Sequence, residues 1–274
     1  GQEIKVQGNI GFLQKELAIN GTIVVYSQKT SGDLILQLDK INAAPISSIL
    51  GGSEELKALS QLSFEISELV EAKGQITINS YKGIYSKSPL AIFNYDLKYD
   101  KAKDTANLNF LDFEVSHILK GSFSGDIEKV TEELIFNLTG NTETLNINDF
   151  MVKMLGDNKD ILSGKLNTKN LKVSGSKTKD DIRLSGVAIL NGFKFNPEKE
   201  DTPSVNNLDC ELDFKQNLNV SSSFSFSSLG KCSVEEFFWD KTGEVRNITA
   251  RADISSKNKW TDNKITLSAL TSKY

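Results

Sequence analysis

Residues Leu208–Lys215 read LDCELDFK, and this stretch decides the fold class. Its apolar residues occupy every second position, and acidic or basic residues occupy the positions between them. Successive side chains of a β-strand point to opposite faces, so this pattern predicts a strand with one dry face and one wet face. Such one-sided strands are typical of antiparallel sheets with one solvated side rather than of buried parallel sheets.

The same alternation recurs along the chain. It is clearest in DLILQLD at 33–39, ELIFNLT at 133–139 and LNVSSSFSF at 218–226. Weaker versions predict further strands at 17–25, 75–79, 90–99, 108–113, 119–123, 164–173, 182–190, 246–254 and 264–270. We therefore expect a mainly β, elongated antiparallel protein.

Two segments depart from this period and predict amphipathic helices. Residues 53–72 carry leucine, isoleucine and valine at spacings of three and four, with Ser53 as a possible N-cap and Gly74 as a stop. Residues 147–155 form a shorter candidate that ends at Gly156.

The surroundings of the two predicted helices are alike. A strand precedes each helix, at 34–38 and at 134–138, and a glycine-led strand follows each, from Gly74 and from Gly164. This similarity predicts an internal repeat, with a first β unit at 1–130 and a second at 131–274. Chance resemblance between alternating strands is the alternative explanation.

Composition narrows the function classes. Net charge is −4 and basic residues form no cluster, so nucleic-acid binding is not expected. Hydrophobic residues make up 38% of the chain, which is too much for a disordered protein. Cys210 and Cys232 could form a disulfide or remain as two buried thiols. No apolar run is long enough to span a membrane, and no signal peptide is visible. The chain opens directly on Gly-Gln-Glu-Ile and stops in a strand-like stretch, so we expect it to be a piece of a longer protein.

The sequence contains no recognisable catalytic or metal-binding set. The single histidine, His117, lies in a strand-like run, and one histidine with two distant cysteines makes no zinc site. Asp209, Glu211 and Asp213 are interpreted as a solvated strand face rather than as calcium ligands. Trp239 is interpreted as a packing residue. We expect neither enzymatic activity nor a cofactor.

Several short motifs resemble those of a known family. They are LNINDF at 145–150, LSGKL at 162–166, LKVSG at 171–175 and IRLSGVAILNG at 182–192. Together they are similar to the repeats of the AsmA-like family, which includes the YhdP and TamB groups of bridge-like lipid transfer proteins. The resemblance is clearest from about 130 to 195, weaker before 130 and faint after 200.

The resemblance implies a fold, a ligand and a location. Family members form a long, curved, taco-like sheet or open barrel with an apolar groove. They are thought to carry phospholipid between the inner and outer membranes of diderm bacteria. This chain would then be a periplasmic, cell-envelope segment that binds phospholipid or another acyl-chain lipid. It shows no membrane anchor of its own, so the anchor would lie in a missing or neighbouring part of the protein.

A lipid-conducting groove needs a continuous apolar stripe without charges, along which each buried CH₂ contributes about 0.8 kcal/mol. The alternating strands offer candidate groove residues. These are Leu34, Leu36, Leu38, Leu134, Phe136, Leu138, Leu184, Leu212, Val220, Phe224 and Phe226. The alternative is that these faces pack on one another in a closed β-sandwich, as in a surface or adhesin-like module that binds protein or carbohydrate.

Overall fold

The structure is a computed structural model that describes most of the chain. The described residues are 1–12, 15–41, 56–80, 90–115, 119–144, 161–176, 178, 181–196, 203–219, 223–238, 244–257 and 263–271. They form fifteen β-strands and no helix. The chain divides into two compact units, Gly1–Leu134 and Ile135–Tyr274, which we describe separately.

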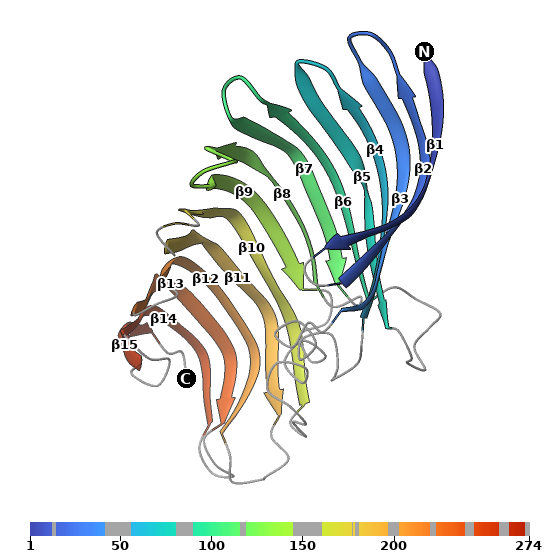
Figure 1. The fold of residues 1–274 in the computed structure, drawn as a ribbon. Coiled ribbons are helices and arrows are strands. Elements are labelled where there is room, and N and C mark those ends of the chain that lie inside the picture. The colour runs from blue at the N-terminus through green and yellow to red at the C-terminus, as the bar shows by residue number, and fades with distance from the viewer. Residues whose placement is uncertain are drawn as a thin grey trace. The chain divides into compact units, whose positions relative to one another are not determined.

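The first unit is a meander of eight antiparallel strands in which each strand pairs with the next one along the chain (Figure 1). The strands are β1 (Gln2–Phe12), β2 (Lys15–Val25), β3 (Thr30–Ile41), β4 (Leu56–Ile66), β5 (Leu69–Ser80), β6 (Ala91–Asp100), β7 (Thr105–Val115) and β8 (Leu119–Glu128). No described pairing joins β1 to β8, so the sheet of this unit is open.

The second unit is a meander of the same kind, and its strands β10 to β14, of 14–16 residues, are longer than those of the first unit. They are β9 (Ile135–Thr144), β10 (Ile161–Ser176), β11 (Asp181–Asn196), β12 (Ser204–Asn219), β13 (Ser223–Phe238), β14 (Glu244–Lys257) and β15 (Asn263–Thr271). Register shifts interrupt β10, β11 and β14. Bulges of this kind bend a strand and increase its twist.

The expected helix at 53–72 is wrong over its described part. Residues 56–66 form β4, and β5 begins at Leu69 after a tight turn in which the Ser67 amide donates to the Leu69 carbonyl over 2.8 Å. The apolar residues of this segment also fit a two-residue period, because Leu62, Phe64 and Ile66 alternate with Ser63 and Glu65. β4 pairs with β5 along its whole length and with β3 except at a register shift between Leu38 and Ile41, so most of its backbone groups have partners in a neighbouring strand.

The stretch 218–226, expected to be one strand, contains the end of β12 and the start of β13, and Leu218 pairs with Phe224 across that connection. The expected helix at 147–155 lies outside the described residues. Residues 56–66 and 69–72, where the first helix was expected, belong to strands, so the described residues of the first unit do not show the expected order of strand, helix and strand.

In the part of the chain that the structure describes, neither unit has a deeply packed core. No large side chain in the described part of the chain is fully buried, and the buried apolar residues are mostly small. They are Ala91, Ala106, Leu108, Leu171, Cys210, Ala250 and Ala252. Within each unit, the described strands therefore form a single sheet rather than two sheets packed face to face.

Candidate functional site: apolar rows across two sheet faces

The register of the first unit places its apolar residues in rows that cross the whole sheet. Residues directly opposite each other in paired strands lie on the same face. One row is Val6, Gly21, Leu34, Leu62, Gly74, Tyr95, Leu111 and Phe123. A second is Gly8, Ile19, Leu36, Ser60, Ile76, Phe93, Phe113 and Gly121, and a third is Ile4, Ile23, Gly32, Phe64, Ala72, Leu97, Leu108 and Gly125.

We call the face that carries these rows the apolar face of the first unit. Its three rows contain no charged residue, and their only side-chain hydroxyl groups belong to Ser60 and Tyr95. Most of its large side chains are half-buried. In β8 the two faces differ along the entire strand, since apolar or glycine positions are half-buried and the positions between them are exposed.

Aromatic rings gather at one side of this face. Phe93 and Phe113 stack with ring centroids 6.2 Å apart, and Phe113 and Phe123 stack with centroids 6.0 Å apart. The three residues come from β6, β7 and β8. Stacked aromatic pairs stabilise a sheet beyond the area they bury, so these three strands present a cohesive apolar surface.

Glycines make room for large neighbours on the same face. A Cβ added to Gly32 would lie 3.0 Å from the ring of Phe64 and 2.5 Å from the backbone oxygen of Thr22. In the second unit, a Cβ added to Gly175 would lie 2.8 Å from the ring of Phe136. Both phenylalanine rings therefore lie over the backbone of the neighbouring strand at a glycine. Any residue larger than glycine would place its side chain in the space that the ring fills.

The opposite face of the first unit is polar and carries the ion pairs. Lys29 Nζ lies 2.6 Å from Glu65 Oε2, and Lys98 Nζ lies 2.8 Å from Glu71 Oε1. The hydrogen bond and the negative charge of Glu71 raise the pKa of Lys98 above its ordinary value. All four side chains remain largely in contact with solvent, so these pairs contribute little to stability.

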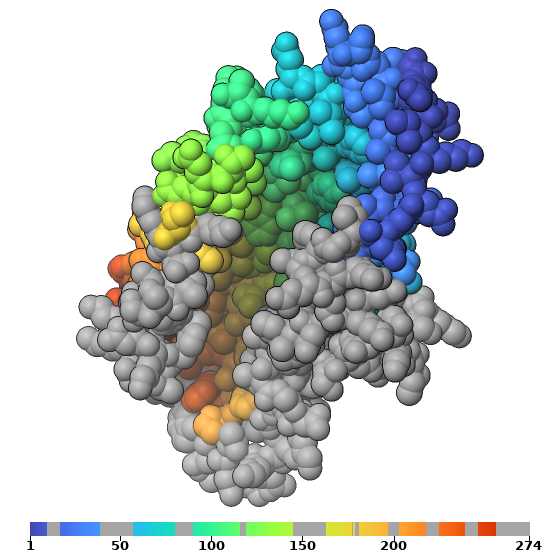
Figure 2. Space-filling view, in the orientation of Figure 1, coloured from blue at the N-terminus to red at the C-terminus, as the bar shows by residue number. Residues whose placement is uncertain are grey.

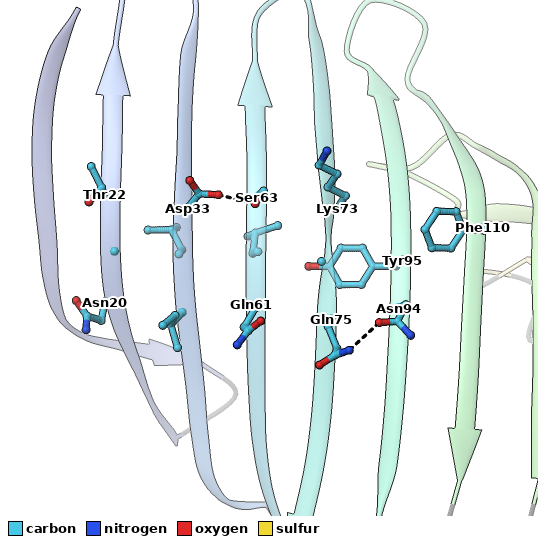
Figure 3. A pocket seen from close by; sticks show the side chains of 15 residues that line it. Asn20, Thr22, Asp33, Gln61, Ser63, Lys73, Gln75, Asn94, Tyr95 and Phe110 are labelled. Atoms are coloured by element: carbon cyan, nitrogen blue, oxygen red, sulfur yellow. Dashed lines mark hydrogen bonds between the residues drawn. The ribbon is translucent and has the colours of Figure 1, made fainter. Parts of the chain in front are cut away.

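A shallow depression of about 640 Å³ lies on this polar face (Figure 3). Gln75 Nε2 donates to Asn94 Oδ1 over 2.9 Å, and the Ser63 hydroxyl donates to Asp33. Ile35 and Phe110 are exceptions to the polar character of the surface, with exposed fractions of 45% and 38%.

The figures show the two faces from opposite sides. Figure 3 looks onto the polar face, with the strands of the first unit running from left to right in chain order. In Figures 1 and 2 the same strands run from right to left while β2 still points upward, so that view is onto the apolar face. Figure 2 shows this face hollowed along β6 to β8, which are drawn in green.

The second unit has a comparable apolar face. One row joins Leu138, Val173, Leu184, Gln216 and Phe226, and another joins Thr142, Thr168, Ala188, Leu212, Gly230 and Ala252. Neither row contains a charge, although threonine and glutamine make this face more polar than that of the first unit.

A disulfide joins Cys210 and Cys232, which lie directly opposite each other in β12 and β13. Their Cα atoms are 4.1 Å apart. Cys210 is buried, with 8% of its surface exposed. The bond lies on the apolar face of the second unit, in a row with Leu190 and Ala250, and it ties two central strands together.

The predicted groove residues divide between the two units. Leu34, Leu36 and Leu38 lie on the apolar face of β3, and Phe136, Leu138, Leu184, Leu212 and Phe226 lie on that of the second unit. Leu134 instead precedes β9, in a turn where its φ is 48° and its amide donates to the Lys129 carbonyl over 2.7 Å. Phe224 belongs to β13, but its side chain, like Val220, lies outside the described part.

Sequence reasoning omitted the aromatic residues of β6, β7 and β8 and most of β4. Strands were expected at 90–99, 108–113 and 119–123, and the alternation of Phe93, Tyr95 and Leu97 was a signal that they share a face. Phe64 was not recognised as a residue of the apolar face, because its segment was expected to be a helix.

The remaining polar candidates form no site. Asp209, Glu211 and Asp213 are exposed on the polar face of β12, and Asp209 Oδ1 accepts a 2.6 Å hydrogen bond from the Gly192 amide. Among the described residues, no three acidic, histidine or cysteine side chains come together in a way that could hold a metal ion. His117 and Trp239 lie outside the described part of the chain.

Comparisons with known proteins add no assignment. No family model, curated protein or solved structure matches the chain. The residues that the structure describes include no helix with the length and apolar character needed to cross a membrane.

Proposed function

We propose that the chain is a non-enzymatic lipid-binding segment that holds acyl chains on the apolar faces of its sheets. The observation that carries the proposal is the apolar face of the first unit, where three adjacent rows cross eight strands without a charge. An acyl chain gains about 0.8 kcal/mol per buried CH₂ on such a surface. Because neighbouring rows are chemically alike, a chain could move between them without meeting a charged barrier.

Incomplete burial also supports an external ligand. In a sandwich, two sheets bury large side chains completely between them. The described part of this chain has no fully buried large side chain. The phenylalanines and leucines of the apolar face thus retain surface that a ligand could cover. This favours a lipid-binding face over the closed core of an adhesin-like module.

The proposed location is the periplasm of a diderm bacterium, in keeping with the AsmA-like motifs of the sequence. The disulfide between Cys210 and Cys232 supports an oxidising compartment, since stable disulfides are rare in the reducing cytosol. On this proposal the segment carries phospholipid between the two membranes of the envelope, and other parts of the protein or its neighbours make the membrane contacts.

The test places a charge on one face or the other of a single strand. Leu36 lies on the apolar face of β3, whereas Ile35 is 45% exposed on the polar face of the same strand. Leu36→Asp should reduce binding of a fluorescent phospholipid at least severalfold, because a carboxylate next to acyl chains must be desolvated. Ile35→Asp is the matched control and should bind like the unmodified protein.

Native mass spectrometry of the purified proteins gives an independent readout. The unmodified chain and Ile35→Asp should carry phospholipid, and Leu36→Asp should carry less, while circular dichroism confirms that all three contain the same sheet. Equal lipid content in both variants, or no lipid in any of the three proteins, would contradict the proposal.

A further inference from the structure

Asn191 and Gly192 form an asparagine–glycine pair in an irregular part of β11. The pairing of β11 with β12 shifts register between Leu190 and Phe193, and a second shift, in β10, comes just before Lys165, the residue opposite Asn191. Gly192 has a φ of 58°, outside the range of an extended strand. The Asn191 side chain is exposed. The main chain at this pair therefore departs from regular strand geometry at a solvent-exposed position.

An asparagine that precedes a glycine can react with its own main chain. The main-chain nitrogen of Gly192 can attack Cγ of Asn191, because the new bond closes a five-membered ring. Glycine has no Cβ to hinder this approach. Apart from its chain neighbours, a Cβ built on Gly192 would come no closer than 3.7 Å to another heavy atom, Asn207 Oδ1. The nitrogen that would attack therefore lies in uncrowded surroundings.

A carboxylate already contacts this nitrogen. The Gly192 amide donates a 2.6 Å hydrogen bond to Oδ1 of Asp209 on β12. The amide must lose that proton as its nitrogen attacks, and a general base has to lie within hydrogen-bond distance of the proton that it removes. Asp209 meets this geometric requirement.

We propose that Asn191 is a site of spontaneous deamidation in which Asp209 acts as the general base. The Gly192 nitrogen forms a bond to Asn191 Cγ while its proton passes to the Asp209 carboxylate. The proton then moves to the side-chain nitrogen of Asn191, and the Cγ–N bond breaks to release ammonia and leave a succinimide ring. Water opens the ring at either carbonyl carbon and gives aspartate or isoaspartate. The reaction adds one negative charge to β11 and does not depend on what the apolar faces bind.

The other asparagine–glycine pair of the chain, Asn20 and Gly21, provides an internal comparison. Asn20 is also exposed, but both residues pair with β1 and with β3 without a register shift. A Cβ built on Gly21 would lie 2.1 Å from the Asp33 carbonyl oxygen, so the neighbouring strand is in close contact there. Ring closure at Asn20 requires the middle of β2 to separate from its neighbours, and local opening of a paired strand is rare. Asn20 should therefore be protected.

Incubation of the purified chain in mildly alkaline buffer, followed by peptide mapping with mass spectrometry, tests the proposal. Asn191 should convert at least about tenfold faster than Asn20, because only Asn20 must first leave a regular paired strand. Asp209→Asn should slow the conversion of Asn191 severalfold, since a neutral amide cannot take up the proton. Asp213→Asn is the matched control, because Asp213 is exposed on the same face of β12 and the variant makes the same charge change. It should leave the rate at Asn191 unchanged.

The ratio of the two rates within one sample also reports whether a variant is folded. In an unfolded chain Asn20 would convert as fast as Asn191, so a folded variant is recognised by a protected Asn20. Equal conversion of the two asparagines in the unmodified chain would overturn the proposal. So would a rate at Asn191 that Asp209→Asn leaves unchanged, or one that Asp213→Asn lowers to the same extent.

Discussion

Phe93 of β6 and Phe113 of β7 lie directly opposite each other on the apolar face, with ring centroids 6.2 Å apart. Phe113 also stacks on Phe123 of β8, so one ring joins three strands. This arrangement makes the face cohesive although no large side chain in the described residues is fully buried. Loss of the shared Phe113 ring should therefore lower the stability of the first unit by a measurable amount.

Phe113→Ala should lower the free energy of unfolding by about 1–2 kcal/mol. A fully buried phenylalanine costs about 3–5 kcal/mol when truncated, and Phe113 is only half-buried. Urea unfolding measures the change. Phe110→Ala is the control, because Phe110 is 38% exposed near the depression on the polar face and should cost much less. Equal losses in the two variants would refute a special role for the stacked rings.

Gly32→Ala should destabilise the sheet by about 1–3 kcal/mol, the usual cost of overpacking. The added methyl group would lie 2.5 Å from the Thr22 carbonyl oxygen and 3.0 Å from the Phe64 ring. Gly8→Ala is the matched control on the same face, where an added Cβ meets no atom within 4 Å. It should be neutral or stabilising, since alanine lowers the entropy of the unfolded chain. Thermal unfolding of both variants distinguishes these outcomes.

Reduction of the Cys210–Cys232 disulfide should lower stability by up to about 3 kcal/mol, because the bond restricts the unfolded chain. Urea unfolding with and without dithiothreitol measures the effect. The double variant Cys210→Ala and Cys232→Ala should unfold at the reduced midpoint and should not respond to dithiothreitol. An unmodified protein that is equally insensitive would show that the bond contributes no stability.

Asp100, at the end of β6, should make stability depend on pH. A hydrogen bond from Lys103 and the amide groups of Ala102 and Lys103 lower the pKa of this carboxyl in the folded protein. A lowered folded pKa contributes stability above the unfolded pKa, and this contribution is lost as pH falls through the folded pKa.

The unmodified protein should therefore be more stable than Asp100→Asn at pH 7, and the difference should shrink toward zero in strong acid. Unfolding curves at a series of pH values test this, and carboxyl chemical shifts report the pKa directly. A stability difference that is constant down to strongly acidic pH would contradict the assigned role of Asp100.

The mainly β class and the two-faced character of the strands are properties of the sequence itself. The alternation of Leu34, Leu36 and Leu38 with polar neighbours is local, and side chains of a strand alternate between faces whatever the strand pairs with. For this reason these residues could be identified as members of an apolar face without knowledge of their partners. The same reasoning located Leu184 and Leu212.

Other features depended on pairing between distant residues. Residues 56–66 satisfy both a helical and a two-residue period, and only pairing with β3 and β5 decides between them. The even spacing of Leu218, Val220, Phe224 and Phe226 continues through a change of strand, so alternation could not reveal where β12 ends. The spacing of apolar residues stays the same when the chain reverses direction between two of them. It therefore cannot show where a strand ends or which strands are neighbours.

The sequence alone therefore determined which side chains within a strand point the same way, because that follows from backbone geometry. The tertiary structure decided which strands are neighbours, and with that the rows that join Leu36 to Phe93 and Phe113 across the sheet. It also decided that Cys210 lies opposite Cys232. Register arises from hydrogen bonds between strands and from the fit of large residues beside glycines, and neither can be read from one strand at a time.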